Sequence, residues 1–169
     1  PRRQKLCLYY LAHEKQTKNI NKEEDLRDAF IRTAAAETFL AWQYYKSKND
    51  SEAKILDRGL IPSQFLRSMM YTFGDYRDIC LNTDISAKTE NGDITKAKNI
   101  IHTIFKDSDK ITNEKVRQEF WEKYGKDIWK GMLCALTHKL NDEENKKKIK
   151  ETYKDPPHNF ASRPQFFRW

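Results

Sequence analysis

The longest regular pattern of apolar residues runs from Asn21 to Lys46 and predicts one long helix. Its apolar residues form two stripes at three- and four-residue spacing, so we expect burial against neighbours on more than one side. No Gly or Pro interrupts the segment, and Asn21 and Glu24 stand where a capping box would begin the helix. At 1.5 Å per residue it would run about 35–40 Å. A helix this long and this apolar predicts the spine of a helical bundle.

Further helical patterns cover most of the remaining chain. A stripe of Met and aromatic residues follows Pro62 and fits either a partner groove or core packing, of which core packing is the better interpretation. No strand-like alternation or internal repeat is present. The sequence therefore predicts an all-α fold, a helical bundle built on two long helices. Besides Asn21–Lys46, we expect helices over residues 1–16, from Ser51 to Gly59, from Pro62 onward, from Asp93 to Phe105, from Asn113 to about Leu140 with a kink or division at Gly125, from Asp142 to Tyr153, and from Ser162 onward.

Composition narrows the class of protein. The chain has 169 residues, enough for one domain with a real core, and 34% of them are charged. No apolar run approaches the roughly 18–20 residues that span a bilayer. The net charge is +7 and the pI is near 9.2. This basicity predicts an anionic partner, which could be nucleic acid, an acidic glycan, lipid head groups or an acidic protein face.

Motifs for chemistry are absent. The sequence contains no Gly-rich phosphate loop, no GxSxG and no HExxH. No set of nucleophile, base and orienting group can be assembled, so we expect neither an enzyme nor a cofactor. No CxxC pair occurs and the four histidines are scattered, which argues against a metal site. The three cysteines fit either buried free thiols or one long-range disulfide with a cysteine left over.

Basic clusters are the remaining signal. On the helix predicted over Asp142 to Tyr153, Ile149 and Tyr153 would anchor one side, while lysines on another side would suit repeated sulfates or phosphates. The alternative is a solvated surface helix that lysines keep soluble. The candidate anion-binding residues are Lys146, Lys147, Lys148, Lys150 and Lys154, with Arg117 as a possible neighbour. A weaker cluster comprises Lys46, Lys48, Lys54 and Arg58.

Five stretches together carry a resemblance to a known family. They are residues 1–7 (PRRQKLC), 73–79 (FGDYRDI), 117–121 (RQEFW), 128–134 (IWKGMLC) and 164–169 (PQFFRW). Their order and spacing resemble the Duffy-binding-like (DBL) domains of the malaria parasite's erythrocyte membrane protein 1 family, over the whole chain. The stretches between them look closest to the X-type DBL domain of the placental variant that adheres to chondroitin sulfate.

The resemblance implies a single helical subdomain over residues 1–169, a fragment of a larger DBL domain with flanking segments missing at both ends. It implies display on the infected erythrocyte, outside the cell, where cysteines tend toward disulfides. Cys7 and Cys134 match motif cysteines of the family and are expected to pair, which leaves Cys80 free or bound to a missing segment. Phe120 replaces the first of two usual tryptophans and Gly131 a commoner alanine, both expected to be core changes. The motifs are structural and do not identify receptor contacts.

Three functions follow from these observations. The first is host-cell adhesion, in which the basic face binds a sulfated glycosaminoglycan such as chondroitin sulfate. Neighbouring domains of the same chain are possible further partners. The domain would reach the membrane only through an anchor elsewhere in the parent protein. The second is a structural and antigenic spacer whose neighbours make the receptor contact. The third, a basic nucleic-acid binder, is disfavoured because no reading-helix motif and no exposed aromatic–basic stacking pattern is found.

Overall fold

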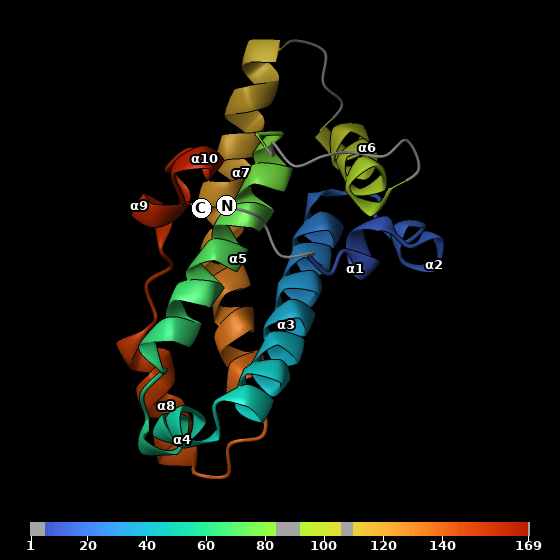
Figure 1. Ribbon diagram of the computed structural model, residues 1–169. Coiled ribbons are helices and arrows are strands. Elements are labelled where there is room, and N and C mark those ends of the chain that lie inside the picture. The colour runs from blue at the N-terminus through green and yellow to red at the C-terminus, as the bar shows by residue number, and fades with distance from the viewer. Residues whose placement is uncertain (1–5, 84–91, 106–109, 169) are drawn as a thin grey trace.

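The computed structural model describes residues 6–83, 92–105 and 110–168, and every regular element in these ranges is helical (Figure 1). The all-α prediction is confirmed. The long helices α3 and α7 contain 26 and 27 residues. The elements are α1 (Tyr9–Ala12), α2 (Glu14–Thr17), α3 (Glu23–Lys48), α4 (Asp50–Ala53), the 3-10 helix η1 (Lys54–Arg58), α5 (Ser63–Leu81), α6 (Asp93–Phe105), α7 (Lys110–Leu136), α8 (Glu143–Thr152), α9 (His158–Ala161) and α10 (Gln165–Arg168).

Three long helices form the core. The chain runs in the same direction along α3 and α7 and in the opposite direction along α5 (Figure 1). The aromatic contacts follow this arrangement, because Phe30 meets Trp121 near the start of α3 and Phe39 meets His138 further along. The Met-aromatic stripe of α5 is buried in this core, as predicted, with Phe65, Met69 and Phe73 at most 3% exposed. Burial of these large side chains is the main stabilising contribution to the bundle.

Three local predictions are wrong. The helix expected over residues 1–16 is broken within the described residues into α1 and α2, because His13 is extended and its Nδ1 accepts a hydrogen bond from the Lys15 N–H at 3.2 Å. The expected division of α7 at Gly125 does not occur, and α7 continues through this position. At the start of α3, the Asn21 N–H donates to Asp25, so Asp25 rather than Glu24 is the carboxylate that reaches back.

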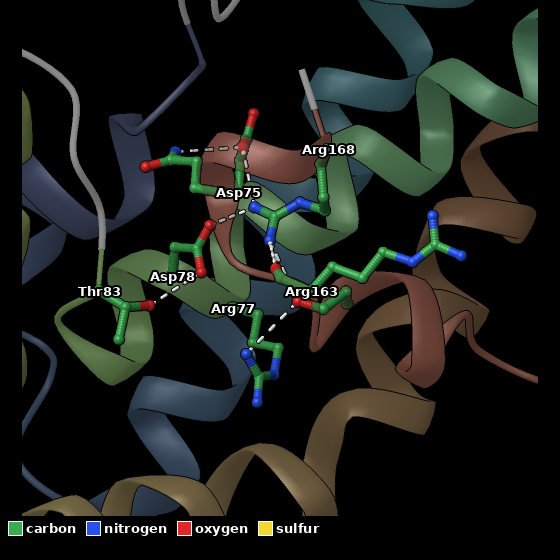
Figure 2. A network of polar contacts seen from close by, with 8 residues as sticks. Asp75, Arg77, Asp78, Thr83, Arg163 and Arg168 are labelled. Atoms are coloured by element: carbon green, nitrogen blue, oxygen red, sulfur yellow. Dashed lines mark hydrogen bonds and ion pairs between the residues drawn. The ribbon is translucent and has the colours of Figure 1, made fainter.

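A buried polar network joins α10 to α5 (Figure 2). The Arg168 guanidinium, 2% exposed, forms ion pairs with Asp75 and Asp78. It passes directly over Gly74, where an added Cβ would lie 2.8 Å from the Arg168 Nε. Gly74 is therefore needed for the close approach of the guanidinium. The motifs at residues 73–79 and 164–169 bind each other, which explains why they occur together.

Tyr76 extends this network to the beginning of the described chain. Its hydroxyl donates to the Cys7 carbonyl at 2.7 Å and also lies 3.4 Å from the Thr33 carbonyl of α3. Burial raises the pKa of the Asp78 carboxyl. Hydrogen bonds from Arg168 and Thr83 lower this pKa but do not cancel the effect of burial. The polar residues of the motif on α5 thus hold three separate segments together, and their role is structural.

We predict that Gly74→Ala destabilises the protein only while Arg168 is present. In the wild-type background the new Cβ must displace the guanidinium from its carboxylates, and we expect a loss of about 1–3 kcal/mol. In an Arg168→Ala background, the same change should instead gain up to about 1 kcal/mol from helix propensity. Urea unfolding of the two single variants and the double variant measures the coupling. Additive effects would contradict the packing of Arg168 over Gly74.

A second buried carboxylate lies on α3. Glu37 is 7% exposed and accepts a hydrogen bond from the Cys7 N–H at 3.0 Å. Burial raises the pKa of Glu37, and the Cys7 hydrogen bond lowers it by less. The folded protein therefore binds more protons at this site than the unfolded chain does. Stability must fall as the pH rises from the ordinary carboxyl pKa through the raised value of the folded state.

We therefore predict that Glu37→Gln is more stable than the wild type at neutral pH. The glutamine keeps an acceptor for the Cys7 N–H but does not bury a charge. The difference in unfolding free energy should shrink toward zero below the ordinary carboxyl pKa, where Glu37 is protonated in both states. Urea titrations over a series of pH values test this. A difference that does not vary with pH would show that the Glu37 charge is not what costs stability.

Candidate polyanion-binding groove

A groove of about 550 Å³ lies between α7 and α8. Leu133 contributes an apolar side chain to it, and the carboxylates of Glu143 and Glu151 also line it. The aliphatic stems of lysines add apolar surface, while their ammonium groups can reach solvent or an anion. The groove's lysines are Lys126 and Lys130 from α7 and Lys146, Lys147, Lys150 and Lys154 from α8 and the residues directly after it.

A cap, a buried side chain and a hydrogen bond to α7 fix the position of α8. Asp142 caps the helix by accepting from the N–H groups of Glu144 and Asn145. Ile149 is fully buried, and Trp129 of α7 donates its Nε1–H to the Tyr153 carbonyl at 2.7 Å. Because these contacts hold α8 beside α7, the lysines of α8 line the groove together with Lys126 and Lys130. The predicted anchors Ile149 and Tyr153 are confirmed.

Tyr153 and Asn145 also tie α8 to the segment before α5. The Tyr153 hydroxyl accepts from the Ile61 N–H at 3.1 Å, and the Asn145 side chain donates to the Asp57 carbonyl at 2.6 Å. These contacts join residues about 90 positions apart in the chain. They hold α8 beside η1 at one end of the bundle, where α4 also lies (Figure 1).

The structure separates the predicted lysines into two groups. Lys146, Lys147, Lys150 and Lys154 line the groove together. Lys148 does not, because its stem runs across Gly59, with its Cδ 2.7 Å from where a Cβ of that residue would be. Gly59 is also where η1 ends, as the sequence predicted.

The proposed contribution of Arg117 to an anion site is wrong. Arg117 is 4% exposed, donates to the Cys80 carbonyl at 3.1 Å, and lies 5.6 Å from the ring centroid of Phe105. It also belongs to the first part of α7, at the end of the bundle opposite α8 (Figure 1). Its charge therefore serves packing between α5, α6 and α7.

Lys126 and Lys130 are groove residues that the sequence analysis missed. They are spaced four apart on α7, so they lie on one face of the helix. This spacing was visible in the sequence, but nothing there showed that α8 folds back beside it. The two helices are joined by the short segment 137–142, which makes them neighbours.

The second basic cluster is less favourable for an anion. Lys46 and Lys54 line a smaller pocket of about 250 Å³ with Lys139, but Asp50 and Asp57 line it too. Lys54 forms an ion pair with Asp50 at 3.4 Å. Lys48 and Arg58 are not among its lining residues. By contrast, the six lysines of the α7–α8 groove exceed its two glutamates by four charges.

Other kinds of site are not found in the described ranges. Residues 6–83, 92–105 and 110–168 contain no group of three or more His, Cys, Asp or Glu side chains placed to hold a metal ion. Within the same residues, no helix is long and apolar enough to cross a membrane. Of the two basic pockets compared above, the α7–α8 groove has the larger excess of positive charge.

These features define a helical bundle whose motif residues pack its elements together and in which six lysines line one groove. Comparison with protein families matches residues 1–168 to the Duffy binding domain, and the chain belongs to that family. Duffy binding domains are extracellular adhesion modules that bind host receptors, and they are not enzymes. No curated protein and no solved structure matches the chain.

The cysteines are free thiols in the structure. Cys80 is fully buried, which raises the pKa of its thiol to about 12, while Cys7 is half-buried and Cys134 is exposed. The expectation that Cys80 is free or bound to a missing segment stays a prediction. The disulfide between Cys7 and Cys134 that the family resemblance implies is not formed here and stays a prediction. Peptide mapping without reduction tests it.

Proposed function

We propose that the chain is a host-cell adhesion domain of a variant surface antigen on infected erythrocytes. Its α7–α8 groove binds a sulfated glycosaminoglycan, and chondroitin sulfate is the proposed ligand. The observation that carries the proposal is the convergence of six lysines from two helices on one groove. Membership of the Duffy binding domain family supports adhesion as the general role. The similarity to X-type DBL domains supports the choice of chondroitin sulfate.

The physical basis is neutralisation of sulfates by lysine ammonium groups. Each contact releases counterions from the polyanion, so affinity should fall steeply as the salt concentration rises. Lys147, Lys150 and Lys154 recur at three- and four-residue spacing, which gives a row about 10 Å long along α8. Lys126 and Lys130 form a second row on α7. Two rows allow charges on both sides of a glycan chain to be met at once.

A structural and antigenic spacer is the second candidate function. The observation that favours it is that the motifs of residues 73–79 and 164–169 are used for packing rather than for ligand contact. In that case neighbouring domains of the same chain make the receptor contact and the groove attracts polyanions incidentally. Chondroitin sulfate would then bind no better than an unrelated polyanion of equal charge.

We predict that the triple variant Lys147→Glu, Lys150→Glu, Lys154→Glu loses at least about 100-fold in affinity for chondroitin sulfate at physiological salt. The slope of log Kd against log salt should become shallower by about two to three, because roughly three contacts between lysines and anionic groups of the glycan are removed. Salt-titrated binding to immobilised chondroitin sulfate measures both quantities, and circular dichroism checks that the variant keeps its helices.

The matched control is Lys18→Glu, Lys22→Glu, Lys96→Glu. These three lysines are exposed, and the control changes the net charge by the same amount outside the groove. It should lose only a few-fold in affinity through the weaker overall field. Equal losses in both variants would refute binding at the groove. Dermatan sulfate and a non-glycan polyanion of equal charge, run in parallel, separate adhesion from the spacer role.

A further inference from the structure

Two carboxylates lie among the lysines of the groove. Glu143 and Glu151 line it together with the six ammonium groups. Glu143 accepts from the Lys146 Nζ at 3.3 Å, while its own side chain is 84% exposed. Along α8 and the residues directly after it, the groove-lining charges follow the order Glu143, Lys146, Lys147, Lys150, Glu151 and Lys154, so a carboxylate stands at each end of a run of three lysines. A ligand that follows α8 therefore meets negative charge at two places about 12 Å apart.

Helix stability accounts for only one of these carboxylates. Glu143 is in the first turn of α8, where a negative charge is favoured by the helix dipole. Glu151 is in the last turn, where the dipole disfavours it. Lys147 precedes Glu151 by four residues, which is the less favourable order for an ion pair on a helix. The stability of α8 therefore does not account for the position of Glu151.

A carboxylate in an anion-binding groove has two opposite effects on a ligand. It repels sulfate or phosphate groups that are placed next to it. It also accepts hydrogen bonds, and so it can bind hydroxyl or amide N–H donors of a sugar. A glycan with sulfates separated by hydroxyl-bearing positions can place donors at the glutamates and sulfates at the lysines. A polyanion such as polyphosphate, which has a charge on every short repeat and no hydroxyl or N–H groups, offers the glutamates no donor and cannot avoid them.

We propose that Glu143 and Glu151 are specificity-determining residues that make the groove discriminate by charge spacing. They disfavour densely charged polyanions that carry no hydrogen-bond donors, and they accept hydrogen bonds from glycans whose anionic groups are interspersed with hydroxyl and amide N–H groups. This inference rests on the proposed function, because it assigns a ligand preference to the same groove. It adds that the preference comes from the carboxylates of the groove, whereas the lysines supply most of the affinity.

The test compares the wild type with Glu143→Gln, Glu151→Gln. The probes are chondroitin sulfate with about one sulfate per disaccharide and inorganic polyphosphate of similar chain length, at equal ionic strength. We expect affinity for polyphosphate to rise about tenfold or more in the variant. Affinity for chondroitin sulfate should change by less than about threefold, because lost repulsion is offset by weaker acceptance of hydroxyl donors. The ratio of the two affinities is the measured quantity.

The matched control is Glu114→Gln, Glu119→Gln. Both residues are exposed and lie on α7 outside the groove, so the control makes the same change in net charge. It should raise both affinities by similar small factors. A ratio that changes no more in the groove variant than in this control would overturn the selective role of the glutamates while leaving adhesion intact. Failure of the wild type to bind chondroitin sulfate would refute the proposed function and this inference with it.

Discussion

The attachment of α8 to α7 is the interaction on which the proposed binding groove depends. A fully buried Ile149 and the hydrogen bond from Trp129 to the Tyr153 carbonyl hold one side of α8 against the bundle. A lysine-rich helix has little tendency to pack by itself, because few of its residues gain from burial. With α8 fixed in this position, its lysines line one groove together with Lys126 and Lys130. Without that attachment the same lysines would be separate surface charges, each with a small effect.

The family motifs belong to the scaffold that makes this attachment possible. The network of Arg168, Asp75 and Asp78 joins α10 to α5, and Tyr76 joins the same helix to the Cys7 carbonyl and α3. Buried charges of this kind contribute little net stability but make alternative packings costly. The motifs at residues 73–79 and 164–169 therefore specify the arrangement of helices, whereas the groove is formed by residues of α8 and by α7 residues that include Lys130 and Leu133 of the motif at 128–134.

The sequence allowed the fold class, the long helices and the anchored, lysine-rich α8 to be predicted, because hydrophobic periodicity and caps are local signals. Three features required tertiary structure. Lys126 and Lys130 became groove residues only through the return of α8 beside α7. Arg117 was misassigned because a charge pattern does not show that its guanidinium meets the Cys80 carbonyl inside the bundle. Lys148 lies among groove lysines in sequence, yet the rotation of α8 turns it toward Gly59.

The most direct test of a groove shared by α7 and α8 is lysine footprinting with an acetylating reagent, in the presence and absence of chondroitin sulfate. Mass spectrometry then reports the protection of each lysine. The account predicts that Lys126 and Lys130 on α7 are protected together with Lys147, Lys150 and Lys154, while Lys148 and Lys18 keep their reactivity. Protection of Lys148 equal to that of Lys150, or no protection on α7, would contradict a ligand held between the two helices.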